Sequence, residues 1–211
     1  MHTPNPGKSE RLLAYVDGFN LYYGLKASGW RRYYWLNMWE LTRSLLRPTQ
    51  RLRGVKYFTA RISAPKEKVK RQSTYLEALG TLAGVQIFYG KYLLTERLCR
   101  RCGFADRVPS EKMTDVNIAV ELMKDAFQDA FDTALLVSAD SDLTAPVAAV
   151  RKLHPQKRIV VAFPPKRSSK ELRRVATACF RIGRVKLARN QFPDPVLKEN
   201  GFALKRPATW H

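Results

Sequence analysis

The most constraining feature of this sequence is a regular alternation between short apolar runs and longer segments with helical periodicity. Apolar runs of about four to eight residues are typical of buried strands, and apolar residues spaced three or four apart are typical of amphipathic helices. Because strands that alternate with helices form parallel βαβ units, we expect an α/β fold in which helices flank a mainly parallel sheet. The expected strands are 12–16, 54–60, 85–89, 133–138 and 158–163.

The segments between these strands predict the helices, and Ser168 or Ser169 is expected to cap the last of them. The expected helices are 18–26, 37–46, 66–79, 116–131, 142–153 and 168–178. In the helix over 116–131 the apolar side chains fall on one face, which is typical of a helix with one buried side. These side chains are Val116, Ala119, Val120, Met123, Ala126, Phe127 and Ala130.

The length of 211 residues suits one ordinary domain with extensions. We expect a flexible N-terminus at residues 1–10 and one Rossmann-like domain at 11–191, with a cysteine-containing loop near 95–110. Prolines in the segment 192–211 predict an extended C-terminal tail that follows the surface. No run approaches the roughly 18–20 apolar residues of a membrane helix, and we identify no secretory signal. We therefore expect a cytoplasmic protein that does not associate with a membrane.

The net charge of the chain indicates the kind of partner that it binds. Lys and Arg number 38 and Asp and Glu 18, which gives a formal net charge of +20. A field of this sign attracts polyanions, and nucleic acid is the favoured one. Thirteen basic residues and one acidic residue lie between positions 143 and 193. The segment 111–142 is the exception, because its eight acidic and two basic residues give a net charge of −6. Carboxylates concentrated in a polyanion-binding protein indicate either bound cations or a solvated helix face.

Two acidic motifs follow predicted strands, where ligands bind in open α/β sheets. Asp17 ends the first strand, and Asp140 and Asp142 follow the strand at 133–138. Converging carboxylates repel one another unless a divalent cation lies between them, and Mg²⁺ and Mn²⁺ prefer all-oxygen ligands. The alternatives are an ordinary turn at Asp17-Gly18 and helix capping by Asp140 and Asp142.

Three short motifs resemble the signature blocks of the NYN domain, in particular the LabA-like bacterial branch of the PIN-like ribonuclease superfamily. The motifs are Tyr-Val-Asp-Gly-Phe-Asn at 15–20, Glu-Lys-Met-Thr-Asp-Val at 111–116 and Val-Ser-Ala-Asp-Ser-Asp at 137–142. The resemblance runs from Leu12 to Ile182, and the Pro-Ala-Thr-Trp ending at 207–210 is similar to this branch as well. It implies a PIN-like sheet and a metal-dependent nuclease site.

The resemblance also implies a ligand set. The residues that match the family's metal-binding acids are Asp17, Asp115, Asp140 and Asp142, and Asn20 matches its polar partner. Glu121 stands where the family often has another acid. Six helical residues separate it from Asp115, a rotation of about 240° net, so the two cannot share one helix face. Ser138 is a candidate hydrogen-bonding partner of the site, and Lys112 is either a phosphate contact or a solvated side chain.

The expected activity is hydrolysis of RNA phosphodiester bonds by water activated on one or two Mg²⁺ or Mn²⁺ ions, leaving 5′-phosphate and 3′-hydroxyl ends. Two other classes remain open. One is a nucleic-acid-binding or adaptor protein without catalysis, which the four acids disfavour. The other is a phosphohydrolase for small phosphates, which the large basic excess disfavours. The sequence leaves open RNA against DNA and the possibility of a homodimer.

Candidate nucleic-acid contacts surround the acidic motifs. Aromatic residues alternate with cations over residues 29–35, which is typical of surfaces that stack on single strands, although several of these rings could be core. The cationic candidates are Arg31, Arg32, Lys166, Arg167, Arg173 and Arg174.

Cys99 and Cys102 have the spacing of half a zinc site, but the sequence supplies no second ligand pair. Two ordinary thiols are therefore favoured over a zinc site, whether the zinc is held within one chain or across a dimer.

Overall fold

A computed structural model describes residues 9–98, 102–103 and 105–210. Six strands form one sheet in the order β3-β2-β1-β6-β7-β8, and every neighbouring pair is parallel. The strands are β1 (Glu10–Asp17), β2 (Gln50–Thr59), β3 (Val85–Tyr89), β6 (Thr133–Val137), β7 (Arg158–Phe163) and β8 (Ala178–Arg181). This confirms the predicted α/β fold.

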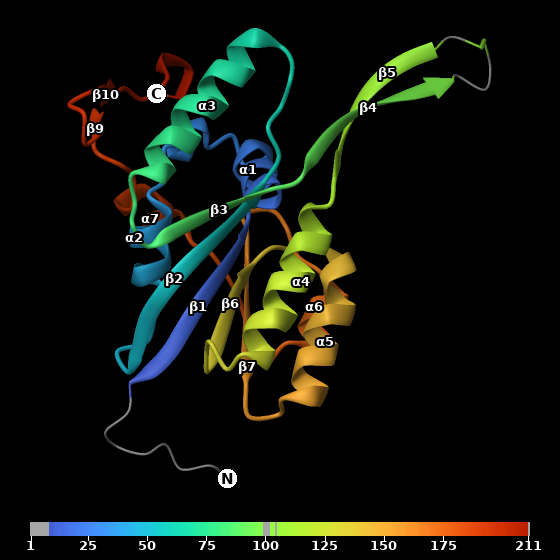
Figure 1. Ribbon diagram of the computed structural model, residues 1–211, viewed down its shortest axis with the longest axis vertical. Coiled ribbons are helices and arrows are strands. Elements are labelled where there is room, and N and C mark those ends of the chain that lie inside the picture. Colours follow the sequence, from blue (N-terminus) through green and yellow to red (C-terminus); the bar gives the residue numbers. More distant parts are fainter. Residues whose placement is uncertain (1–8, 99–101, 104, 211) are drawn as a thin grey trace.

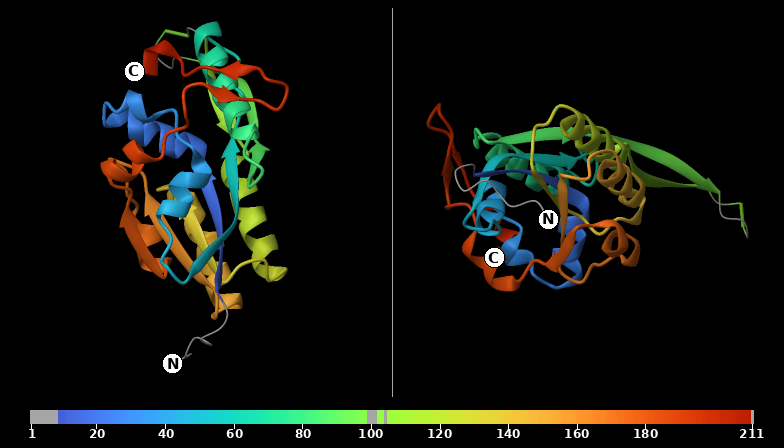
Figure 2. Two further views of the ribbon diagram at one scale, coloured as in Figure 1. Left: turned by 90° about the vertical axis from the view of Figure 1, so that its left-hand side faces the viewer. Right: turned by 90° about the horizontal axis from the view of Figure 1, so that it is seen from below.

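Helices cover both faces of this sheet (Figures 1 and 2). One layer contains α1 (Gly18–Ala27), α2 (Met38–Ser44) and α3 (Lys66–Gly80), and the other contains α4 (Thr114–Phe127), α5 (Thr144–Leu153) and α6 (Lys170–Val175). Strand β1 serves both cores, since successive side chains of a strand point to opposite faces. Leu12, Ala14 and Val16 join the first core, while Leu13 and Tyr15 join the second. Both cores are therefore fixed to the strand that ends in Asp17.

The region predicted as a cysteine-containing loop is instead an antiparallel hairpin. Strands β4 (Lys91–Leu98) and β5 (Ala105–Lys112) pair along their whole length, from Lys91 opposite Lys112 to Leu98 opposite Ala105. The hairpin projects from the body of the molecule (Figure 1). Strands β4 and β5 form backbone hydrogen bonds with each other, and the hairpin is a separate two-stranded sheet that does not pair with the main sheet. Residues 1–8 of the expected flexible segment 1–10 lie outside the described residues, and Glu10 already belongs to β1.

The predicted buried face of α4 is wrong. Val116, Val120, Met123 and Phe127 are exposed, and Phe127 keeps 83% of its surface accessible. The side chains that pack inward are Thr114, Ile118, Leu122, Asp125 and Ala126. The helix also ends at Phe127 rather than at Phe131, which is a buried residue of the loop before β6. Helix α4 thus buries one stripe and leaves a second apolar stripe on its outer side.

The end of the chain is more ordered than the sequence predicts. Helix α6 ends at Val175 rather than at Ala178, which is instead the first residue of the edge strand β8. Ser169 caps α6 as predicted, since its hydroxyl accepts the backbone N–H of Leu172 at 3.1 Å. The chain continues through α7 (Arg184–Arg189), the short pair β9 (Val196–Leu197) and β10 (Ala203–Leu204), and a 3₁₀ turn (Ala208–Trp210). Within the described residues, no helix is long and apolar enough to span a bilayer.

Candidate metal centre

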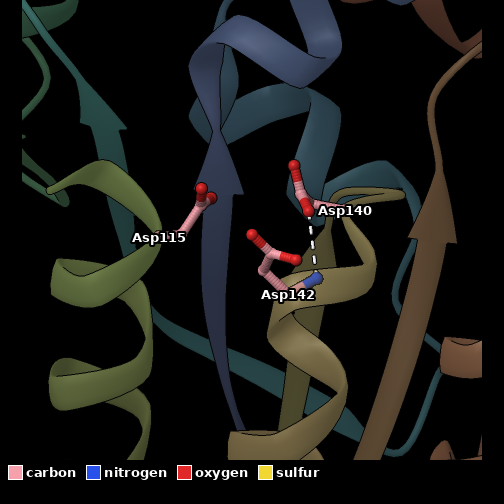
Figure 3. Close-up of side chains that lie close together, drawn as sticks. All are labelled: Asp115, Asp140 and Asp142. Atoms are coloured by element: carbon pink, nitrogen blue, oxygen red, sulfur yellow. Dashed lines mark hydrogen bonds between the residues drawn. The ribbon is translucent and has the colours of Figure 1, made fainter. Parts of the chain in front are cut away.

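Three carboxylates converge at the carboxyl edge of the parallel sheet (Figure 3). One oxygen each of Asp115, Asp140 and Asp142 lies within 4.8 Å of the others. Asp115 comes from the first turn of α4, and the two other residues belong to the segment that follows β6. Divalent cations hold oxygen ligands at distances from about 2.0–2.1 Å for Mg²⁺ to about 2.3–2.6 Å for Ca²⁺, so oxygens that share one ion lie no more than about 4–5 Å apart. The three carboxylates therefore fit one divalent cation.

The loop after β6 is held in place by its own polar groups. The Ser138 hydroxyl, which is fully buried, accepts the backbone N–H of Asp140 at 3.0 Å. Asp140 in turn accepts the backbone N–H of Asp142 at 3.0 Å, so it caps the 3₁₀ turn Ser141–Leu143. The predicted alternative of capping is thus correct for Asp140, and the capping is made through one oxygen. These hydrogen bonds hold the loop in a conformation in which the carboxylates of Asp140 and Asp142 lie close to that of Asp115 (Figure 3).

Asp17 and Asn20 connect the first helix to this loop. Asp17 is 4% exposed; its carboxylate accepts the backbone N–H of Asn20 and the hydroxyl of Ser138, each at 2.9 Å. The Asn20 side chain accepts the backbone N–H of Ala139 at 3.1 Å. Asp17 does not belong to the group of three carboxylates within 4.8 Å of one another. In this arrangement it positions the loop that carries Asp140 and Asp142.

Ionisation of Asp115 is unfavourable beside the other two carboxylates. Burial, followed by the charges of Asp140 and Asp142, raises the pKa of Asp115 to about 6. A divalent cation removes this penalty, because it replaces repulsion between carboxylates by attraction to a shared positive charge. The donor set, all carboxylate oxygen, suits a hard cation.

Glu121 lies in a separate ionic cluster. Its carboxylate pairs with Lys56 at 2.6 Å and with Lys124 at 2.5 Å. Lys56 also contacts the buried Asp125 at 2.5 Å, and the Tyr15 hydroxyl donates to Asp125 at 2.6 Å. Burial opposes ionisation of Glu121, but the hydrogen bonds from Lys124 and Lys56 lower its pKa overall. Glu121 has the partners of a structural ion pair, as its position on the helix indicated.

The predicted nucleic-acid contacts are spread over three segments. Arg31 and Arg32 are exposed in a 3₁₀ turn (Arg31–Tyr33), whereas Tyr33, Tyr34 and Trp35 are core residues. Lys166 and Arg167 follow β7, and the guanidinium of Arg167 lies over the ring of Tyr23 at 5.7 Å. The remaining candidates, Arg173 and Arg174, are exposed on α6, and Lys112 is exposed at the end of β5.

The cysteines supply no described metal site. Cys102 is exposed with a free thiol, and Cys179 is half-buried in β8 with a free thiol. Cys99 lies outside the described residues. In the described part of the chain, the group of potential ligands that meets the geometry of a metal site contains carboxylates alone. Zinc at Cys99 and Cys102 stays an untested prediction.

A cavity of about 610 Å³ lies beside the start of α1, and the sequence analysis did not predict it. Its walls come from α1, the end of β2, α3 and the C-terminal turn, and include Tyr22, Tyr34, Arg71 and Trp210. Gly18 lines the cavity and directly follows Asp17, so the cavity and the metal centre adjoin there. A Cβ atom at Gly18 would meet the Phe58 carbonyl oxygen at 2.8 Å, so only glycine lets α1 start this close to β2. The Tyr-rich sequence of α1 was the available signal.

Comparison with known proteins identifies the family. The sequence profile of the NYN domain matches residues 11–183, most of the chain. The chain belongs to the NYN domain family. This assignment confirms the resemblance seen in the three motifs and places the chain in the PIN-like nuclease superfamily. The acidic cluster at the sheet edge fits metal binding in such a domain.

The similar proteins include one curated relative and one solved structure that aligns with nearly the whole of its own chain. The 6-hydroxy-3-succinoylpyridine 3-monooxygenase HspA of Pseudomonas putida is 27% identical, and the match covers 73% of this chain and 59% of HspA. The NYN chain thus spans well under two thirds of that curated relative. A solved structure from Vibrio parahaemolyticus, a protein of unknown function, matches 87% of this chain and 98% of its own with a TM-score of 0.55 and 19% identity. That likeness supports the fold alone.

Proposed function

We propose that this NYN protein is a divalent-metal-dependent ribonuclease. The observation that carries the proposal is the convergence of Asp115, Asp140 and Asp142, whose oxygens lie within 4.8 Å of one another. Such a site suits a substrate that brings phosphate charge to a cation, and the net charge of +20 suits a polyanion rather than a small phosphate. We take single-stranded or structured RNA as the substrate, and Mg²⁺ or Mn²⁺ as the cation.

The roles of the side chains follow from their contacts. Asp115, Asp140 and Asp142 would hold the ion, which when bound supplies an activated water and neutralises charge on the scissile phosphate. Asp17 is the fourth acid of the site, and by accepting the Asn20 backbone N–H and the Ser138 hydroxyl it would position the loop that carries Asp140 and Asp142. Asn20 and Ser138 position the loop after β6. The cations at 31–32, 166–167 and 173–174 would contact the strand on either side of the cleaved bond.

Cleavage of labelled single-stranded RNA and matched DNA tests the proposal. The purified protein is assayed with Mg²⁺, Mn²⁺ or EDTA, beside Asp140→Asn and a control, Glu199→Gln, which removes an exposed carboxylate far along the chain. We expect metal-dependent cleavage of RNA that Asp140→Asn abolishes and Glu199→Gln preserves. Tight RNA binding without cleavage in either metal would instead identify a binding or adaptor protein. Steep salt dependence of binding would separate both from a phosphohydrolase of small phosphates.

A second candidate function is oxidation of a small aromatic acid, the reaction class named for the Pseudomonas putida relative. The aromatic-lined cavity of about 610 Å³ favours it, because its volume suits a small ligand. Oxygen uptake that depends on a hydroxypyridine carboxylic acid and a reduced nicotinamide, with no cleavage of RNA, would place this candidate first.

A further inference from the structure

The cavity beside the start of α1 is built by parts of the chain that are distant in sequence. Helix α1 and helix α3 form two walls, and the C-terminal turn supplies Thr209 and Trp210. Tyr57 and Thr59 contribute from the end of β2, the same edge of the sheet at which Asp17 ends β1. A ligand in the cavity would therefore lie next to the helix start that carries Asp17.

Aromatic side chains form a continuous wall. The rings of Tyr22 and Tyr34 are 5.0 Å apart, those of Tyr34 and Trp210 are 5.5 Å apart, and those of Tyr75 and Trp210 are 6.1 Å apart. The hydroxyl of Tyr75 donates to the Leu36 carbonyl at 3.0 Å, which fixes that ring. Tyr22 is 36% exposed, so its ring remains accessible, while the other rings support it from within. An accessible aromatic ring on a rigid support suits stacking by a planar ligand.

The charges of the cavity all have one sign. Lys26, Arg31, Lys68 and Arg71 line it, and no described carboxylate does. None of the four forms an ion pair with any residue that the structure describes, in contrast to Lys56, Lys157 and Arg11 elsewhere in the protein. Burial and Tyr23 raise the pKa of Tyr22, while the positive charges of Arg71 and Arg31 act in the opposite direction. Cations that have no carboxylate partner among the described residues, set around an aromatic wall, favour a ligand that carries negative charge.

We propose that this cavity binds one nucleotide, with its base stacked on Tyr22 and its phosphate held by Arg31 and Arg71. A cavity of this volume is within the range of ligand sites, about 300–1,000 Å³. The nucleotide can be free or part of a strand, and the strand form would place a neighbouring phosphodiester at the metal centre; only that form rests on the proposed function. The cavity would then select the nucleotide beside the cleaved bond.

Direct binding tests the inference without requiring cleavage. Calorimetry measures the affinity of the protein for AMP, UMP, adenosine, inorganic phosphate and benzoate. Adenosine lacks the phosphate and inorganic phosphate lacks the base, so the comparison gives the contribution of each group to the affinity. The variants are Arg71→Gln, Arg31→Gln and Tyr22→Ala, with Arg189→Gln as the control because it removes an exposed arginine on α7. All are checked by thermal unfolding, and the two arginine variants keep the test open if Tyr22→Ala does not fold.

We expect AMP or UMP to bind at one site, and each arginine variant and Tyr22→Ala to weaken binding about tenfold. Adenosine and phosphate alone should bind more weakly than the mononucleotide, and Arg189→Gln should not change the affinity. The inference is overturned if neither mononucleotide binds, if benzoate binds more tightly, or if the control weakens binding as much as the cavity variants do.

Titration with an oligonucleotide distinguishes a free nucleotide from a nucleotide within a strand. It also distinguishes failure of the cavity inference from failure of the proposed ribonuclease function. Short RNA is titrated into Asp140→Asn protein, which keeps the cavity but lacks one acid of the metal centre. Tighter binding of RNA than of AMP, lost in an added Arg71→Gln change, indicates a nucleotide within a strand. Mononucleotide binding in a protein that cuts no RNA would retain the cavity inference and reject the ribonuclease. Cleavage without any dependence on Tyr22, Arg31 or Arg71 would do the reverse.

Discussion

The metal centre and the aromatic cavity adjoin at Asp17 and Gly18, yet they differ in charge and in construction. The metal centre joins three carboxylates from two short segments, each placed by the end of a strand or the start of a helix. The cavity joins four cations and a wall of aromatic rings from α1, β2, α3 and the C-terminal turn. In the proposals above, a phosphodiester would bind the cation of the metal centre, and the neighbouring nucleotide would bind the rings and cations of the cavity. One strand of RNA would then occupy both regions.

The largest effect is expected from the carboxylates. Asp140→Asn should lower metal-dependent cleavage more than about 100-fold, because loss of an outer partner of a metal ligand alone costs about 10–100-fold. Nucleotide binding in the cavity should be unchanged. Single-turnover cleavage and calorimetry with AMP check the two halves of this prediction. Equal losses in both measurements would mean that the two regions form one site.

Trp210→Ala should damage the cavity and spare the metal centre. Trp210 is 8% exposed and contacts the rings of Tyr34, Trp35 and Tyr75, so its removal should cost about 3–5 kcal/mol of folding stability. Denaturant unfolding measures that loss. At a temperature where the variant is folded, AMP binding should be lost while Mn²⁺ binding, followed by electron paramagnetic resonance, stays intact. A parallel loss of Mn²⁺ binding would contradict the separation.

Glu121→Gln should leave cleavage within about twofold of the native protein while Asp115→Asn abolishes it. Both residues are acids of α4, but Glu121 pairs with Lys56 and Lys124, away from the three carboxylates. Loss of those charge-assisted hydrogen bonds should cost about 1–2 kcal/mol of stability. The pair of variants is compared by cleavage rate and by denaturant unfolding. A large fall in rate for Glu121→Gln would put that acid in the site.

Stability in EDTA is expected to depend on pH through Asp115. The pKa of Asp115 is about 6 in the folded protein and 3.8 for the unperturbed group. Below pH 4 both states are protonated and Asp115 contributes nothing. Between pH 4 and 6 the unfolded state loses its proton first, so stability falls as pH rises, and above pH 6 the penalty is constant.

Asp115→Asn removes this penalty, so its Tm should match the native protein at pH 4 and exceed it at pH 7. Saturating Mg²⁺ at pH 7 should make the Tm of the unsubstituted protein higher than that of Asp115→Asn. The cation binds the ionised Asp115 carboxylate and so stabilises the folded state of the unsubstituted protein, whereas the variant lacks this carboxylate. Thermal unfolding with and without Mg²⁺ measures both. Identical Tm values at pH 7 in EDTA would show that the carboxylates do not repel one another.

Helix α4 shows where prediction from the sequence stops. Ile118 and Leu122 on the buried stripe are separated by four residues, and so are Val116 and Val120 on the exposed stripe. Periodicity therefore identifies a helix but cannot choose between its two apolar sides. The choice is made by Asp125, which must face the sheet because Lys56 of β2 and Tyr15 of β1 contact it there.

The sequence by itself determined the strands of the parallel sheet other than β8, most of its helices and the strand-end acids Asp17, Asp140 and Asp142, while Asp115 came from the resemblance to the NYN domain. These features depend on local patterns: apolar runs, helical spacing and Asp residues at strand ends. The tertiary structure alone decided the side that α4 buries, the hairpin of β4 and β5, the pairing of Glu121 and the cavity closed by Trp210. Each of these depends on contacts between residues far apart in the chain, and no local pattern records which distant segment a side chain will meet.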